Sequence, residues 1–237
     1  HGAHGYILCQ FLSPEVNLRE DRFGGSLDNR TAVIREIIAG IRARCRPDFN
    51  LGLRLSPERF GLQLSEILSF AQSLMTAGDI DYLDMSLWDV FKEPNEDGFK
   101  SKPLVDWFMD LDRRDVRIGV AGKIMDAATA RRCIEHGADF VTIGRAAILH
   151  HDFPELSRDP AFEPIALPVT RQHLLLRLGH HLVAPELADL VAHHLAHARQ
   201  GRTVYVVLCV PQVRAHQRLG AVQVTGLHRH ADHQFGH

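Results

Sequence analysis

The chain has 237 residues, of which 45% are hydrophobic and 24% charged, and its formal net charge is −2. This near-neutral balance argues against a protein that binds nucleic acid or a membrane surface, because both kinds usually carry a basic excess. The sequence shows no signal peptide and no apolar run close to the roughly 18 residues that span a bilayer. Its four cysteines form no CxxC pair. These features predict a cytoplasmic globular protein.

Short apolar runs alternate with amphipathic segments through the first 155 residues. Apolar alternation closed by polar, proline or glycine residues predicts strands over 51–56, 80–87, 117–123 and 139–144. Apolar residues at helical spacing, together with capping signals, predict helices over 30–44 and 64–77, one opened by Pro103, and one that runs from the cap Asp126 to Gly137.

This order of elements predicts an α/β fold with a parallel sheet, either doubly wound or a (βα) barrel. Such folds place their chemistry at the carboxyl ends of the strands. A closed barrel needs eight strands, so four strands correspond to about half of one. The chain also opens on His1 rather than on Met, and we expect it to be a piece of a longer chain.

The composition changes near residue 173. Lysine is absent after Lys123, and eleven of the sixteen histidines lie within 173–237. We therefore expect two parts, residues 1–172 and an atypical His-rich tail over 173–237 that is poorly ordered, read in a shifted frame or joined from elsewhere. A helix over 185–200 and a strand over 203–210 are plausible within it.

The first residues carry the most distinctive chemistry. His1 and His4 are two imidazoles three residues apart, and Tyr6 follows them. Two neutral imidazoles that converge on one point can each donate an N–H to a carbonyl or phenolate oxygen, as an oxyanion hole does. A nearby phenol can deliver a proton. The alternatives are a chance HxxH on a surface turn or half of a metal site.

Several ordered motifs carry a family resemblance over residues 1–172. They are HGAHGY at the start followed by QFLSP, then LRLSP within 51–57, VAGKI at 120–124, FVTIGRAAILHHDFP at 140–154 and PVTRQH near the end. Together they resemble the old yellow enzyme family of FMN-dependent ene-reductases. The resemblance implies the C-terminal half of a (βα)8 barrel, about strands 5–8, that holds FMN and takes NADH or NADPH as reductant.

The resemblance also assigns roles near the reacting atoms. His1 and His4 would bind the oxygen of an activated alkene, a small-molecule electrophile, and Tyr6 would be the proton donor. Arg54 of LRLSP would lie beside the flavin N1/O2 edge, where its permanent charge would stabilise the anionic reduced flavin. The alternative for Arg54 is an ion pair inside the barrel mouth.

The last two predicted strands end in residues suited to a phosphate. Gly122, Gly144 and Arg145 would bind the FMN phosphate, since glycine admits close approach of backbone N–H groups and arginine offers a bidentate fork. Lys123 is a weaker candidate, and a solvated side chain is equally compatible with its position.

Two other readings stay open. The chain could be a non-catalytic half-barrel that needs its missing N-terminal half, and we expect its exposed edges to cause aggregation or pairing into a homo-oligomer. A metal-binding protein is a third reading, carried by the tail, where His193 and His197 are four residues apart without the glutamate of HExxH. We expect no metal role for His150 and His151, a buried unreactive Cys9, and packing roles for Trp88 and Trp107, although Trp88 could also touch substrate.

Overall fold

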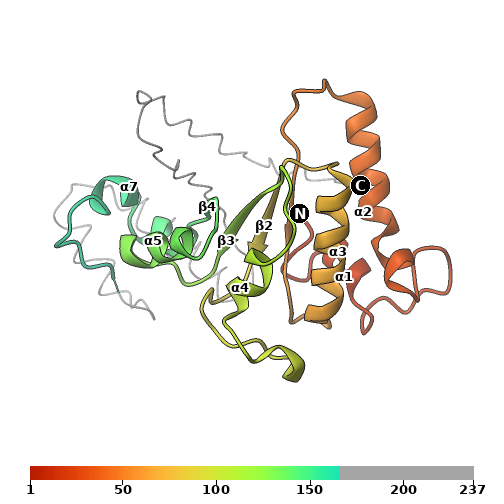
Figure 1. Ribbon diagram of the computed structural model, residues 1–237, viewed down its shortest axis with the longest axis horizontal. Helices are drawn as coiled ribbons and strands as arrows, with labels where there is room; N and C mark the ends of the chain where they lie inside the picture. Colours follow the sequence, from red (N-terminus) through yellow and green to blue (C-terminus); the bar gives the residue numbers. More distant parts are fainter. Residues whose placement is uncertain (166–237) are drawn as a thin grey trace, which may run out of the picture.

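A parallel four-stranded sheet organises the computed structural model, which describes residues 1–165 (Figure 1). The strands follow one another in space in the order in which they occur in the chain. They are β1 (Gly52–Leu55), β2 (Tyr82–Ser86), β3 (Arg117–Ala121) and β4 (Phe140–Val141). The α/β class with a parallel sheet, predicted from the alternating pattern, is confirmed.

Each connection between neighbouring strands contains a helix, as parallel pairing requires. The helices are α1 (Ile7–Leu12), α2 (Leu27–Arg44), α3 (Leu64–Ala77), η1 (Asp97–Phe99, a 3-10 turn), α4 (Leu104–Met109), α5 (Ala127–Glu135), α6 (Arg145–Leu149) and α7 (Phe153–Leu156). In Figure 1, α2 and α3 lie beside each other on one side of the sheet, and α5 lies toward its other end.

The start of the chain extends the sheet beyond β1. The backbone N–H of Gly2 donates to the carbonyl of Arg54 over 2.7 Å, and Gly2 forms a parallel bridge with Leu55. Residues 1–3 therefore run alongside β1, on the side opposite β2. This pairing places His4 near the carboxyl ends of β1 and β2.

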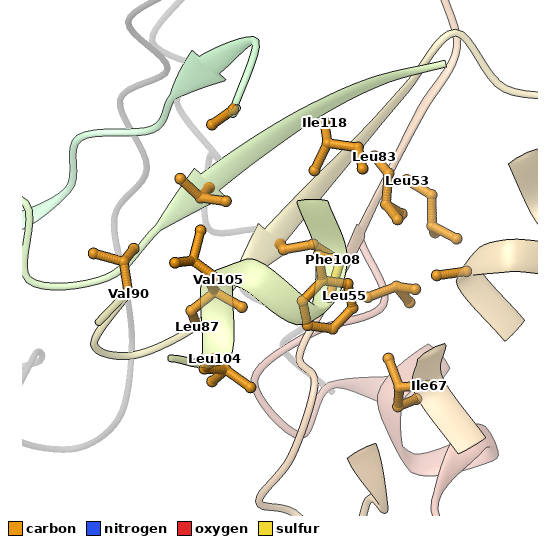
Figure 2. Close-up of a cluster of buried hydrophobic side chains, with 14 of the residues drawn as sticks. Leu53, Leu55, Ile67, Leu83, Leu87, Val90, Leu104, Val105, Phe108 and Ile118 are labelled. Atoms are coloured by element: carbon orange, nitrogen blue, oxygen red, sulfur yellow. The ribbon is translucent and has the colours of Figure 1, made fainter. Parts of the chain in front are cut away.

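One face of the sheet packs against the helices. Leu53, Leu55 and Leu83 are buried on this face, and Figure 2 shows them on the side where Phe108 of α4 and Ile67 of α3 lie. Alternate residues of each strand point to opposite faces, so this apolar set leaves Arg54 and Asp84 on the other face. Burial of large aliphatic side chains on one face stabilises the layered fold.

The other face of the sheet combines glycines with aromatic rings. A Cβ on Gly52 would lie 2.0 Å from the ring of Tyr82, and one on Gly119 would lie 2.0 Å from the ring of Phe140. The two rings meet edge to face with their centroids 5.8 Å apart. Each glycine therefore leaves room for the aromatic ring of the residue with which it pairs in the neighbouring strand.

Capping side chains explain most of the helix boundaries. Asp126 accepts from the backbone N–H of Thr129 over 2.7 Å and starts α5, as predicted. Helix α3 has the predicted bounds, and Gly78 ends it with a φ of 71°. Helix α2 begins at Leu27 rather than at residue 30, because Ser26 supplies the N-cap.

Several expectations differ from the structure. The helical spacing predicts that Ile37 lies on the apolar side of α2, but this side chain is 43% exposed. The buried face of α2 is formed by Ile34 and Ile38 instead. Strand β4 is shorter than the predicted 139–144, and it pairs only with β3 within the described sheet. Helices α1 and α7 are separate elements that the sequence pattern does not predict.

Some expectations lie outside the described residues. These are the boundary at residue 172, the His-rich tail with its possible helix and strand, Cys209, and the pair His193 and His197. Among residues 1–165, the three cysteines are free, and no helix is long and apolar enough to cross a membrane.

The buried Phe108 provides a test of this packing. Replacing Phe108, whose side chain is fully buried, with alanine should lower the free energy of unfolding by about 3–5 kcal/mol, because it removes transfer energy and leaves a cavity. Urea denaturation followed by circular dichroism measures this change. The exposed Ile37→Ala is the matched control, with an expected change of about 0.5 kcal/mol or less. Equal effects of the two changes would contradict the proposed core.

Candidate active site

A small open pocket lies where β1 and β2 end. Three stretches of chain form its wall: the start of the chain, the loop after β1 and the loop after β2. The lining residues are His4, Ser56, Pro57, Glu58, Arg59, Phe60, Ser86, Leu87 and Trp88. Its position agrees with the general placement of ligand sites at the carboxyl ends of parallel strands.

A buried ion pair connects the two strands beneath the pocket. Arg54 Nε lies 3.3 Å from Asp84 Oδ2, and the register pairs these two residues directly. Asp84 is only 6% exposed, and its Oδ1 accepts a hydrogen bond from Thr142 Oγ1 over 3.2 Å. Burial raises the pKa of the Asp84 carboxyl, whereas the neighbouring Arg54 charge acts in the opposite direction.

His4 contacts the residues around this pair. Its backbone N–H donates to Ser56 Oγ over 3.0 Å, and its Nε2 forms a 2.5 Å hydrogen bond with Ser86 Oγ. Arg54 Nη2 donates to the same hydroxyl over 3.5 Å. Burial, with a further contribution from the Arg54 charge, lowers the pKa of His4 to about 4, so its imidazole is neutral at pH 7.

The structure brings the three predicted residues at the start of the chain together. The ring centroids of His1 and His4 are 5.4 Å apart, and those of His1 and Tyr6 are also 5.4 Å apart. Tyr6 is the N-cap residue of α1 and is exposed. Two imidazoles and one phenol therefore line one edge of the sheet, next to the pocket.

Arg54 lies where the sequence placed it, at the carboxyl end of a strand. Its contact with Asp84 is an ion pair, as in the alternative stated for it. A role beside a flavin is compatible with this contact, because the pair holds the guanidinium at a fixed place near His4.

Gly122 and Lys123 connect the end of β3 to the loop after β2. Gly122 has a φ of 150°, and a Cβ there would lie 2.7 Å from the carbonyl carbon of Trp88. Lys123 Nζ forms a 2.8 Å ion pair with Asp89. Both residues therefore contact this loop, although the Lys123 side chain stays 54% exposed.

Gly144 is the N-cap residue of α6 and Arg145 is its first residue; Thr142 and Ile143 separate them from the end of β4. A Cβ on Gly144 would meet no heavy atom of the described residues within 4 Å. Arg145 is exposed and forms no ion pair with another of residues 1–165. At Gly122 a side chain would collide with the neighbouring loop, whereas at Gly144 the described residues leave room for one. The space beside Gly144 is therefore compatible with a bound anion.

The sequence analysis missed several pocket residues. Ser56, Ser86 and Arg59 are absent from its candidates, although Ser56 stands two residues after Arg54 and Ser86 two residues after Asp84. This spacing of two residues along each strand is the signal that could have found the serines. Arg59 lies in a loop, where no comparable pattern exists.

The remaining candidates have structural roles. The ring of His150, which is buried, packs against Phe162, and its Nε2 accepts from the backbone N–H of Ile165. Trp107 packs edge to face on Phe99, and Cys9 is buried with a pKa raised by burial, as expected. Residues 1–165 contain no cluster of three side chains suited to a metal ion.

Comparison with known protein families assigns this chain to one of them. Residues 1–158 match the model of the NADH:flavin oxidoreductase / NADH oxidase family. The chain belongs to this family. The resemblance to the old yellow enzymes is thereby confirmed; this is a family of oxidoreductases that use FMN with NADH or NADPH as reductant.

Individual relatives cover the same part of the chain. A probable NADH-dependent flavin oxidoreductase, YqiG, of Bacillus subtilis (strain 168) is 32% identical over 158 residues, which are 63% of this chain and 42% of that protein. An NADPH dehydrogenase of the same strain is 31% identical over 166 residues, 68% of this chain and 45% of that protein. A structure of morphinone reductase in complex with tetrahydroNAD matches with a TM-score of 0.52 at 27% identity, covering 68% of this chain and 45% of that one. The chain thus spans less than half the length of these relatives.

The neutral state of His4 gives a prediction about pH. Because the folded chain holds the pKa of His4 near 4, the unfolded chain takes up this proton at a higher pH, near 6.5, so His4 should make the fold less stable as the pH falls from about 6.5 to 4. Replacing Arg54 with glutamine should raise the pKa of His4 while leaving it below 6.5, because burial remains.

A titration of the His4 imidazole by NMR measures both values, with His4→Gln used to assign its signal. The matched control is Arg46→Gln, which removes one exposed charge that pairs with Asp48 before β1. A His4 pKa near 6.5 in the unaltered chain, or no change on Arg54→Gln, would contradict the electrostatic description of the site.

Proposed function

We propose that this chain supplies the FMN-binding and substrate-binding part of an NAD(P)H-dependent oxidoreductase that reduces activated alkenes. The convergence of His1, His4 and Tyr6 with Arg54 at one edge of the sheet carries this proposal. The four strands would correspond to strands 5–8 of a (βα)8 barrel, and the location would be cytoplasmic. Two copies would pair through the edge of β4, which within residues 1–165 pairs only with β3.

The residues present fit FMN in two respects. Gly144 leaves open space, and the adjoining Arg145 offers a guanidinium without an ion pair among residues 1–165, so these two would hold the phosphate. Arg54 is held at the mouth by Asp84 and would face the ring system. Gly122 and Lys123 would contribute less than the sequence suggested, because both already contact the loop after β2.

FMN, when bound, supplies the hydride chemistry. The imidazoles of His1 and His4 would donate hydrogen bonds to the carbonyl or nitro oxygen of the alkene and polarise its double bond. Ser86 orients the His4 ring through the bond to Nε2. The Tyr6 hydroxyl would deliver a proton to the carbon next to the polarised group.

A non-catalytic half-barrel is the second candidate function. It is favoured by the four strands that residues 1–165 form, half the number in a closed (βα)8 barrel. In this case the chain would bind FMN only when the missing strands are supplied as a separate polypeptide.

Quenching of FMN fluorescence by the full chain tests the proposal. We expect saturable binding, and Arg145→Gln should weaken it by about tenfold or more, because a charge-assisted contact to phosphate is lost. Arg46→Gln, which changes the net charge equally, should leave binding unchanged. Addition of p-hydroxybenzaldehyde should then produce a long-wavelength charge-transfer band that disappears when His1 and His4 are both replaced with alanine.

The outcomes separate the two candidates. Binding that appears only after the missing half of a relative is added in trans would favour the non-catalytic half-barrel. Absence of FMN binding under both conditions would overturn the proposal.

A further inference from the structure

We propose that Gln10 is a positioning residue of the candidate site: its side-chain amide fixes the turn that holds Tyr6, the proposed proton donor, beside the histidines. The inference rests on the proposed function, because it specifies what keeps Tyr6 in place. It begins from the first residue of the QFLSP motif, which neither the pocket nor the proposed alkene reduction uses.

A tight turn connects His4 to Tyr6. The backbone N–H of Tyr6 donates to the carbonyl of Ala3 over 3.2 Å, and the two residues between them, His4 and Gly5, have φ angles of 59° and 72°. Two successive positive φ angles are typical of a type I′ turn, in which Gly, Asn and Asp predominate. A histidine persists in such a conformation only where surrounding contacts enforce it.

The strand ends hold the first half of this turn. The backbone N–H of His4 donates to Ser56 Oγ over 3.0 Å, and its Nε2 forms the 2.5 Å bond with Ser86 Oγ. Tyr6 has no comparable anchor among residues 1–165, since its side chain is 42% exposed and its ring contact is with His1. The position of Tyr6 therefore depends on the backbone around it.

Gln10 binds the peptide unit that joins Gly5 to Tyr6. Its Nε2 donates to the carbonyl of Gly5 over 2.8 Å, while the N–H of the same peptide unit donates to Ala3. Because a peptide unit is planar, bonds at both its ends fix its orientation, and with it the direction in which Tyr6 leaves the turn. The backbone N–H of Gln10 also donates to the carbonyl of Tyr6 over 2.9 Å. Gln10 thus binds the peptide units on both sides of Tyr6.

The loop after β1 contacts the same turn. A Cβ on Gly5 would lie 3.1 Å from Cδ1 of Phe60, so the Phe60 ring lies close against this glycine. This contact limits movement of the Gly5 Cα but does not bind the Gly5 carbonyl. Among residues 1–165, the hydrogen bond to that carbonyl comes from the Gln10 side chain.

The exposure of Gln10 separates a positioning role from a stabilising one. Because Gln10 is exposed, water can replace its bond to Gly5, and loss of the amide should cost the fold little. Proton delivery, in contrast, requires the Tyr6 hydroxyl at a fixed place next to the reacting carbon. Loss of the Gln10 amide should therefore affect the site more than the fold.

NMR spectroscopy of the full chain without flavin tests the inference. The chain contains three tyrosines, so Tyr6→Phe assigns the Tyr6 ring signals. We expect a nuclear Overhauser contact between the rings of His1 and Tyr6, and we expect it to disappear in Gln10→Met, which has a similar length but no donor. The pKa of His4 should stay near 4 in this variant, because the serines at the strand ends keep its ring buried.

Further variants test whether the donor itself matters. Gln10→Glu keeps the shape of the side chain but cannot donate at pH 7, so it should also lose the ring contact, whereas the ammonium of Gln10→Lys can donate and should retain it. The matched control is Gln72→Met. Gln72 of α3 makes the same kind of bond, from Nε2 to the carbonyl of Asp112 over 3.0 Å, and its loss should leave the ring contact unchanged.

Two results would overturn the inference. One is a contact between His1 and Tyr6 that survives in both Gln10→Met and Gln10→Glu. The other is loss of the contact together with a rise of the His4 pKa toward 6.5, because the exposure of His4 to water would show that the whole turn opens.

Kinetics of the FMN-loaded chain provide an independent test. Because Gln10 acts through Tyr6, the double variant Gln10→Met, Tyr6→Phe should reduce an activated alkene as fast as Tyr6→Phe alone. A further loss of rate in the double variant would contradict the inference. A chain that does not bind FMN would contradict only the proposed function, and the ring contact measured without flavin would still decide the role of Gln10.

Discussion

The candidate site depends on the ion pair between Arg54 and Asp84. The parallel register of β1 and β2 places these residues opposite each other on the face of the sheet that points away from the helices. A buried charge is costly unless it is paired and hydrogen-bonded, and Thr142 adds the further bond to Asp84. The pair fixes Arg54, whose charge helps to keep His4 neutral and whose guanidinium donates to Ser86.

Two glycines that follow strands of the sheet have different surroundings. Gly122 and Gly144 both follow strands, yet Gly122 admits the backbone of Trp88, whereas Gly144 leaves open space among the described residues. The close approach at Gly122 positions the loop after β2, and with it the tryptophan that contacts Arg59. The pocket at the ends of β1 and β2 is therefore lined by three stretches that are far apart in the sequence: the start of the chain, the loop after β1 and the loop after β2.

Much of the fold could be predicted, because its signals are local. Alternating apolar residues located the strands, and the left-handed Gly78 and the cap Asp126 located helix boundaries. The helix start at Leu27 was missed because a polar first turn, capped by Ser26, precedes the apolar stripe.

The candidate site was predictable only in part. His1, His4, Tyr6 and Arg54 belong to motifs that the sequence displays, whereas the contacts of Ser86 and Arg59 do not. The two-residue spacing from Asp84 marks Ser86 as a residue at the strand end, but its contact with His4 depends on how the chain start pairs with β1, and the contact of Arg59 with Trp88 depends on left-handed loop residues.

A double-mutant cycle on Arg54 and Asp84 tests the central claim most directly. The free energy of unfolding is measured by urea denaturation for Arg54→Met, Asp84→Leu and the double variant. A buried pair predicts that each single change is strongly destabilising, since it leaves one charge unpaired, and that the double variant recovers at least about 1 kcal/mol relative to the sum. Additivity within about 0.5 kcal/mol would show that the two side chains do not interact, and would contradict the central place of this ion pair in the site.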